Sequence, residues 1–197
     1  FKQKTAYEIR LSLVGSEMCI RDRFIKGEHI SLRAMEHDDI ELLYEWENNI
    51  ELWHVSNTQT PFSRHVLKEF VDNSQYDIYT NKQLRLMAVE NSTSQTIGTI
   101  DFFEFDVQHA RVGVGIYIHQ NYTGKGYAYE SLKLAINYCF NILHLKQVYS
   151  IVNSSNAPSL KLFEKAGFEK TGIKKSWNKT SINHFEDAWF LQLVNDK

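Results

Sequence analysis

Two kinds of hydrophobic pattern alternate along the chain, and each predicts a different secondary structure. Stretches with the apolar and β-branched pattern of β-strands are residues 29–33, 83–90, 96–105, 111–119, 147–152, 169–177 and 185–194. Short polar turns join the second, third and fourth of these stretches, near residues 91–95 and 106–109. We therefore predict an antiparallel meander in the middle of the chain.

Between the strands, apolar residues recur at helical spacing. Asp38 and Asp39 are candidate N-caps of the first predicted helix, and Ser63 of the second. A third helix follows the glycines of segment 124–126, and a short fourth helix ends at Gly167. The residues expected to face inward in the first two helices are Ile40, Leu43, Tyr44 and Trp46, then Val66, Leu67, Phe70 and Val71.

The predicted order is strand, two helices, three strands, helix, strand, helix and two strands. No repeat, low-complexity tract or internal linker interrupts it. We therefore predict a single α/β domain with a central mixed, mostly antiparallel sheet flanked by helices.

Residues 1–23 do not fit this order. Their apolar run LSLVG is too short for a signal-peptide core, and no small-x-small cleavage site follows it. The string RLSLVGSEMCIRDR resembles a translated sequencing-adapter tail. We expect residues 1–23 to be a non-native or disordered extension and residues 24–197 to form the domain.

Composition excludes several classes of protein. The chain has 197 residues, of which 43% are hydrophobic, so it is long and apolar enough to fold around a core. No stretch approaches the roughly 20 apolar residues of a membrane span. The net charge of −2 argues against nucleic-acid binding. With two cysteines and no metal-ligand spacing among the eight histidines, we expect no metal and a cytoplasmic location.

The first candidate chemical motif is Asn-Tyr-Thr-Gly-Lys-Gly-Tyr-Ala at residues 121–128. Gly124 and Gly126 allow backbone amides to approach a ligand, and the following helix offers unpaired N–H groups and a positive dipole end. Such a site suits a pyrophosphate, although a glycine-rich turn by itself is more often only a turn. The segment does not match the P-loop, because Gly126 follows Lys125, nor GxGxxG, because residue 129 is Tyr.

The second motif lies about 30 residues further on, in Asn156-Ala-Pro-Ser-Leu-Lys-Leu-Phe-Glu-Lys-Ala-Gly-Phe168. Alone it reads as a capped helix with a glycine stop. Together, the two motifs and the strand between them resemble the GNAT superfamily of acetyltransferases, over roughly residues 28–194.

The resemblance implies that acetyl-CoA is the co-substrate. The strand over 114–118 would splay from its neighbour and pair its backbone with the pantetheine arm, while the glycine motif cradles the pyrophosphate. The cofactor-binding residues implied are Ile116, Tyr117, Ile118, Thr123, Gly124, Lys125, Gly126, Tyr127, Ala128, Asn156, Ser159 and Lys165. Two positions depart from the family. Phe163 stands where many members carry a tyrosine acid, and Gly113 where several polyamine enzymes carry Glu.

Residues 32–49, 97–106 and 135–149 are similar to the spermidine and diamine acetyltransferases and their ribosomal-protein acetyltransferase relatives. A free alkyl ammonium must lose a proton before it attacks a thioester, so a carboxylate is expected near the acceptor amine. Glu104 is the favoured base or water-holder and Asp101 its rival. Because they lie three apart, they face opposite sides of a strand unless a bulge intervenes. The candidate substrate-binding residues are Glu45, Glu47, Asn48 and Asp106.

Three functional hypotheses follow. The first is a polyamine or diamine N-acetyltransferase, the second acetylates a protein N-terminus or another small amine, and the third is a catalytically silent domain that senses coenzyme A. We favour the first, and expect a small-molecule amine substrate, no nucleic-acid or membrane partner, and a homo-oligomer.

Overall fold

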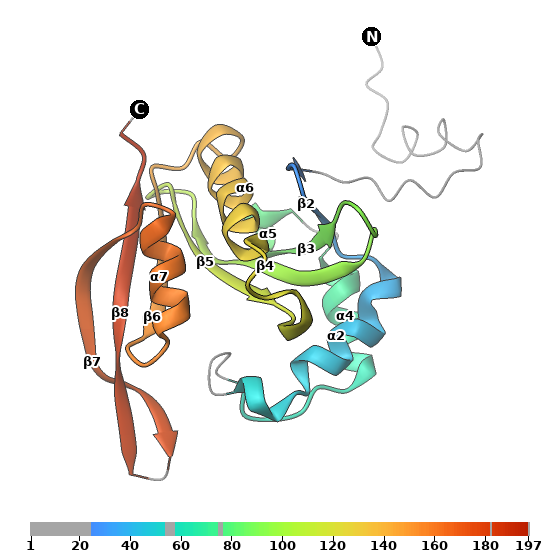
Figure 1. Cartoon of the computed structure of the whole chain (residues 1–197), viewed down its shortest axis with the longest axis horizontal. Helices are drawn as coiled ribbons and strands as arrows, with labels where there is room; N and C mark the ends of the chain where they lie inside the picture. The colour runs from blue at the N-terminus through green and yellow to red at the C-terminus, as the bar shows by residue number, and fades with distance from the viewer. Residues whose placement is uncertain (1–24, 54–57, 75–76, 182, 197) are drawn as a thin grey trace.

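The computed structural model describes residues 25–53, 58–74, 77–181 and 183–196. In this part of the chain, one eight-stranded sheet runs in the order β1-β2-β3-β4-β5-β6-β8-β7 (Figure 1). Neighbouring strands are antiparallel except β5 and β6, which are parallel. The strands are β1 Ile25–Lys26, β2 Ile30–Ala34, β3 Leu84–Glu90, β4 Thr96–Asp106, β5 Arg111–Ile118, β6 Gln147–Asn153, β7 Glu169–Ser181 and β8 His184–Val194. The predicted mixed, mostly antiparallel sheet is confirmed.

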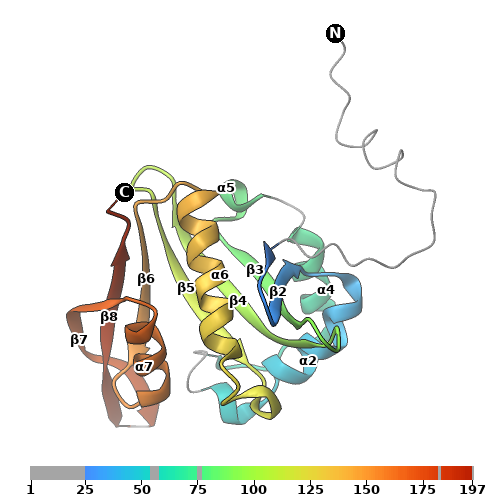
Figure 2. The same cartoon turned by 45° about the horizontal axis from the view of Figure 1, so that its top comes forward.

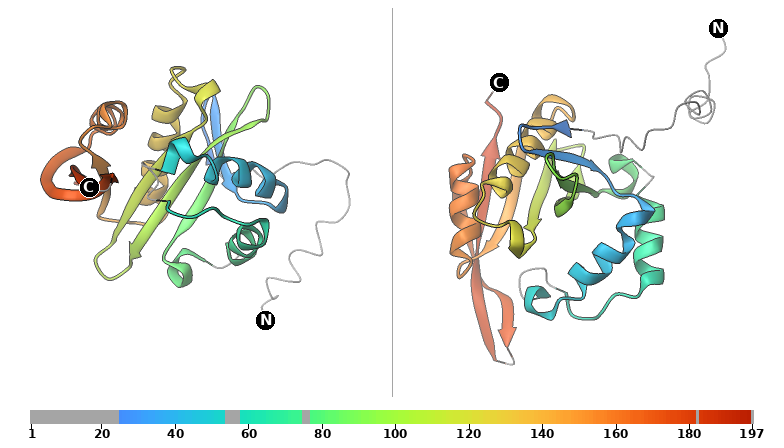
Figure 3. Two further views of the ribbon diagram at one scale, coloured as in Figure 1. Left: turned by 90° about the horizontal axis from the view of Figure 1, so that it is seen from below. Right: turned by 45° about the vertical axis from the view of Figure 1, so that its right-hand side comes forward.

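Helices cover both faces of this sheet. The α-helices are α2 Ile40–Glu47, α4 Arg64–Asn73, α5 Ile78–Asn81, α6 Tyr127–Asn141 and α7 Ala157–Lys165. Short 3-10 turns are His37–Asp39, Ile50–Leu52 and Gln120–Tyr122. Leu86 and Ala88 of β3 pack in the core under α6, whereas Met87 between them packs with α2 and α4. Figures 2 and 3 show α6 and α7 on one face and α2 and α4 on the other.

Local capping chemistry sets the helix ends, as the sequence predicts. Ser63 Oγ accepts a hydrogen bond from the Val66 amide, and Asn156 Oδ1 accepts one from the Ser159 amide. Gly167, with φ of 101°, follows α7 and supplies the left-handed stop.

Several predicted details are wrong. Asp39 does not cap α2 with its side chain. Its carboxylate binds Arg33 at 2.6 Å, and both side chains are buried. A buried guanidinium needs a paired charge more than a helix end needs a cap. Val66 was expected to face inward but is 46% exposed, because Leu67 and Val71 form the buried stripe of α4. The two-residue β1 and the four-residue α5 were not predicted.

The sheet divides between β5 and β6 (Figure 2). The two strands pair only at Arg111 with Gln147, Val112 with Val148, and Gly113 with Tyr149. Beyond Gly113, β5 remains paired with β4 as far as Ile118 but leaves β6. The predicted splay over residues 114–118 is therefore present.

Three further predictions concern the N-terminal segment, membrane spans and metal sites. Residues 1–23 lie outside the described residues. Among the helices that the structure describes, none is both long and apolar enough to cross a membrane. Within those same ranges, no group of three or more His, Cys, Asp or Glu side chains is placed to hold a metal ion.

Candidate active site

A cavity of about 670 Å³ opens where β5 and β6 diverge. Side chains from both faces of the sheet, from α7 and from the β7–β8 hairpin contribute to its walls. The lining residues are Trp46, Glu47, Leu52, Arg85, Thr99, Asp101, Phe103, Glu104, Val114, Gly115, Ile116, Tyr117, Ser150, Ile151, Val152, Asn153, Asn156, Ser159, Phe163, Lys174, Trp177 and Asn178.

One wall of this cavity is an open edge of backbone. From Val114 to Ile118, β5 has β4 on one side and no paired strand on the β6 side. Backbone N–H and C=O groups require partners when they are removed from water. An extended ligand with amide groups can therefore add to this edge as a further strand would. Ile116 and Tyr117 line the cavity here.

A second anchoring surface lies at the start of α6. Gly124 and Gly126 have φ values of 77° and 85°, a region that favours glycine. A Cβ at either position would meet no atom within 4 Å, so the backbone there faces open space. Lys125 Nζ lies 5.2 Å from the centre of the Tyr122 ring. The helix N-terminus and the nearby ammonium make this surface suitable for a phosphate.

The neighbouring predicted cofactor residues hold this region in place. Tyr127 Oη donates a hydrogen bond to Glu90 on β3, and Thr123 Oγ1 donates one to the Gln120 carbonyl at 2.8 Å. Lys165, at the end of α7, places its ammonium 4.5 Å from the centre of the Tyr129 ring on α6. Ala128 lies in the first turn of α6.

The α7 wall carries the second motif. Asn156 and Ser159 line the cavity, and the Asn156 side chain is engaged as the helix cap. Phe163 also lines the cavity and is 2% exposed. Its ring meets Phe168 edge-on, with 4.9 Å between ring centres. The phenyl ring at this position therefore packs into the core and offers no proton to the cavity.

Arg85 of β3 lies between two of the predicted carboxylates. Its guanidinium forms ion pairs with Glu47 of α2 and with Asp101 of β4. Burial lowers the pKa of Arg85, but the charges of Asp101 and Glu47 outweigh this effect and raise it. Thr99 Oγ1 donates a hydrogen bond to the other Asp101 oxygen at 3.1 Å. Arg85 therefore offsets part of the negative charge that Glu47 and Asp101 bring to the cavity.

Glu104 occupies a bulge in β4. Its φ is 51°, and the pairing of β4 with β5 shifts between Phe103 and Asp106. The bulge breaks the alternation of the strand, so Asp101 and Glu104 line the same cavity although they are three residues apart. The condition stated from the sequence, that a bulge would be needed, is met. Tyr149 Oη donates a hydrogen bond of 2.5 Å to Glu104 Oε2.

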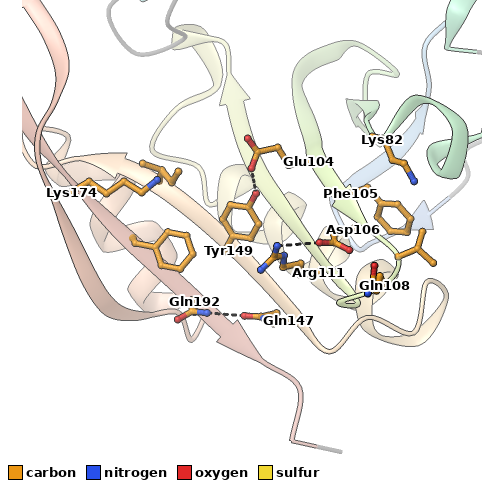
Figure 4. A pocket seen from close by; sticks show the side chains of 13 residues that line it. Lys82, Glu104, Phe105, Asp106, Gln108, Arg111, Gln147, Tyr149, Lys174 and Gln192 are labelled. Carbon is orange, nitrogen blue, oxygen red and sulfur yellow. Dashed lines mark hydrogen bonds and ion pairs between the residues drawn. The ribbon is translucent and has the colours of Figure 1, made fainter.

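A second cavity, of about 840 Å³, shares part of its wall with the first. Figure 4 shows the side chains that line this second cavity. Glu104, Ile151 and Lys174 line both cavities. The remaining lining residues are Lys82, Phe105, Asp106, Val107, Gln108, Arg111, Gln147, Tyr149, Phe190 and Gln192. Arg111 pairs with Asp106 at 3.1 Å, so Asp106 belongs to this cavity and not to the first.

The structure places the other predicted acceptor residues outside both cavity walls. Glu45 is exposed on α2. Burial, followed by the charges of Glu45 and Glu47, raises the pKa of Tyr117. The Asn48 amide brackets the backbone of Phe62, accepting from its N–H at 2.8 Å and donating to its carbonyl at 3.0 Å. Of the predicted acceptor residues, only Glu47 therefore meets Asp101 and Glu104 in the first cavity.

Residues 29–169 match the family described as an acetyltransferase (GNAT) domain. The chain belongs to the GNAT acetyltransferase family. The uncharacterized N-acetyltransferase p20 of Bacillus licheniformis is 29% identical to this GNAT chain over 172 residues, which cover 85% of the chain and 93% of p20. Spermidine N(1)-acetyltransferase of Escherichia coli (strain K12) is 27% identical over 144 residues, covering 73% of this chain and 74% of that protein.

The fold of this GNAT domain also matches a solved structure. The crystal structure of spermidine N-acetyltransferase from Vibrio cholerae in complex with CoA and spermine superposes with a TM-score of 0.77 at 23% identity. The match covers 85% of this chain and 96% of that one. At this identity the likeness shows the fold alone.

Several residues that line one or both cavities of this GNAT domain were not predicted from the sequence, namely Arg85, Tyr149, Lys174, Trp177 and Asn178. Arg85 gave a usable signal, because it is a basic residue in an otherwise apolar strand. Trp177 is a large aromatic residue left 54% exposed. Tyr149 gave no usable signal in the sequence, because a tyrosine within a buried strand ordinarily packs in the hydrophobic core.

Proposed function

We propose that this GNAT domain acetylates a primary amine with acetyl-CoA and that the amine is a polyamine or diamine. One observation carries the acceptor class: the charged side chains of the 670 Å³ cavity are three carboxylates and two cations. Glu47, Asp101 and Glu104 outnumber Arg85 and Lys174, so a cationic acceptor restores the balance. The names of the spermidine-acetylating relatives support the same class.

Acetyl-CoA would span the open edge of β5 and the start of α6. We assign the pantetheine arm to the backbone of Ile116, Tyr117 and Ile118, and the pyrophosphate to segment 123–128. Asn156, Ser159 and Lys165 would flank the arm from α7. The support for this arrangement is the unpaired edge of β5 and the two left-handed glycines that follow this strand in the chain.

In the proposed reaction, the amine nitrogen attacks the thioester carbonyl carbon, the carbon–sulfur bond breaks and the thiolate leaves. The ammonium must first lose a proton, and we assign its removal to Glu104, directly or through a water molecule. Asp101 is the weaker candidate, because Arg85 occupies one of its oxygens and Thr99 the other. A backbone N–H of the open β5 edge would polarise the thioester carbonyl.

Phe163 cannot protonate the leaving thiolate. A free thiol has a pKa of about 8.5, so a thiolate departs at neutral pH without full protonation. The protein therefore needs no acid at this position, and solvent protonates the thiolate after it has left.

A second acceptor class is favoured by the second cavity. Its charged side chains are Lys82, Arg111 and Lys174 against Glu104 and Asp106, an excess of positive charge. Because the two cavities share a wall, an acceptor longer than a diamine would extend over these cations. A peptide whose N-terminal amine enters the first cavity and whose acidic groups lie over the second would suit them.

The test is thiol release from acetyl-CoA with spermidine, spermine, putrescine, amino acids and N-terminal peptides as acceptors. We expect turnover with the polyamines. Glu47→Gln should raise KM for putrescine more than for a monoamine of the same length. Turnover of peptides but of none of the polyamines would select the second acceptor class. Absence of thiol release with every acceptor tested would overturn the enzymatic proposal. We also propose a cytoplasmic location. We further propose that the protein is a homo-oligomer, and gel filtration would test this oligomeric state.

A further inference from the structure

We propose that Tyr149 is a positioning residue that fixes the Glu104 carboxylate between the two cavities for proton transfer. This rests on the proposed function, in which Glu104 takes the proton of the acceptor. The hydrogen bond of 2.5 Å from Tyr149 Oη to Glu104 Oε2 is the contact that would perform it. Figure 4 shows the two side chains pointing toward each other across the second cavity.

Glu104 needs such a partner because its own surroundings do not fix it. The residue is exposed and lines two cavities, so its long side chain would otherwise sample several rotamers. Its backbone is held in the left-handed region, at a φ of 51°, which is strained for a non-glycine residue. Such strain at a cavity wall is a common mark of a functional position.

Tyr149, in contrast, is rigid. It is buried, and its ring stacks on Phe190 at 5.3 Å and meets the edge of Phe103 at 5.9 Å. Its backbone lies in β6, paired with Gly113 on one side and with Gln192 on the other. The Gly113 pairing is the last contact before β5 and β6 diverge. A fixed hydroxyl therefore stands at the point where the sheet opens.

The nearby cations are engaged with groups other than Glu104, so the hydrogen bond from Tyr149 is the contact that orients the Glu104 carboxylate. Lys174 lines both cavities, but its ammonium lies 4.1 Å from the centre of the Trp177 ring. Arg111 is paired with Asp106, and Arg85 with Asp101. Burial, followed by the hydrogen bond and charge of Glu104, raises the pKa of Tyr149, so the hydroxyl stays a donor. The transferred proton passes from the amine to Glu104, and Tyr149 keeps its own.

The experiment is a double-mutant cycle on turnover, with Tyr149→Phe, Glu104→Gln and the double variant. Tyr149→Phe keeps the ring and its packing but removes the donor, and should lower kcat about tenfold with KM for acetyl-CoA unchanged. Glu104→Gln should lower kcat by about a hundredfold. The double variant should match Glu104→Gln alone, because Tyr149 acts only through Glu104.

Two further variants separate positioning from packing. Glu104→Asp keeps the carboxylate but withdraws it from Tyr149, and should also lower kcat about tenfold. Tyr138→Phe removes a hydroxyl from a buried tyrosine of α6 that lines neither cavity, and should leave kcat unchanged. Thermal unfolding of every variant would show that the assayed proteins are folded.

The outcomes are distinct. Normal kcat in Tyr149→Phe, or losses that multiply in the double variant, would overturn this proposal while leaving the proposed function intact. Absence of amine acetylation by the unaltered protein would overturn both.

Discussion

The ring of Phe103 fills the space beside Gly113. A Cβ atom built on Gly113 would lie 2.2 Å from Phe103 Cε2, a distance that no native contact adopts. Gly113 is one of the two positions at which the sequence departs from the family resemblance described above. In this chain the Phe103 ring of β4 occupies the space that a side chain at position 113 of β5 would need. Packing alone therefore requires a glycine at this position.

This relationship predicts the effect of refilling position 113. Gly113→Ala should destabilise the protein by about 1–3 kcal/mol, because the Phe103 ring must move out of a packed site. The matched control is Gly115→Ala, whose Cβ would meet its nearest neighbour, Asp101 Cβ, at 3.8 Å. Denaturant unfolding would compare the two. Equal stability of both variants would show that Phe103 moves freely.

Arg85 should limit the affinity for a diamine. Arg85→Met removes the cation that Glu47 and Asp101 share, so KM for putrescine should fall about fivefold, or roughly 1 kcal/mol. Arg64→Met removes an arginine from the exposed pair with Glu41 and is the matched control. Steady-state kinetics at two ionic strengths would test this, since the gain should shrink at high salt. An increased KM would mean that Arg85 itself holds the acceptor.

The glycines before α6 should determine acetyl-CoA affinity. Gly126→Ala introduces a side chain at a φ of 85° on the surface assigned to the pyrophosphate, and should weaken binding at least tenfold, or about 1.4 kcal/mol. Gly124→Val should do the same. Gly172→Ala on β7 also meets no atom within 4 Å and serves as the control. Calorimetric titration that gave unchanged affinity for a folded Gly126→Ala protein would remove the assignment.

Phe163 should be tolerant of a hydroxyl and intolerant of truncation. Phe163→Tyr should leave kcat unchanged or raise it, because it introduces an acid where the cavity has none. Phe163→Ala should destabilise the protein by roughly 3–5 kcal/mol, because the side chain is buried against Phe168. Stopped-flow kinetics and thermal unfolding would measure the two effects. A large loss of kcat in a stable Phe163→Tyr protein would contradict the first expectation.

The raised pKa of Tyr149 predicts a pH dependence of stability. Burial and the Glu104 charge raise this pKa in the folded protein, so the unfolded chain loses the proton first. The contribution of Tyr149 to the free energy of unfolding is therefore fully present below the unfolded pKa of about 10. This contribution is lost as the pH rises above that value. Melting temperatures between pH 8 and pH 11 should fall less steeply for Tyr149→Phe than for the unaltered protein. Parallel curves would show that Tyr149 does not titrate in this range.

The sequence by itself determined the features that near neighbours control. Ser63, Asn156 and Gly167 set helix ends, and each acts through atoms no more than a few residues away. Strand periodicity likewise gave the meander and the buried strand β6. The two motifs around Gly124 and Asn156 indicated the family, and the family model matches residues 29–169.

Only the tertiary structure decided which charges meet. Arg85 and Asp101 face each other because β3 pairs with β4 in a register that places them opposite, and Glu47 arrives from a helix on the same face. The contact between Tyr149 and Glu104 depends on a bulge in one strand and on the pairing of another. Such contacts join residues between 16 and 45 positions apart in the chain. Their geometry follows from strand register and backbone strain, which no local pattern of side chains specifies.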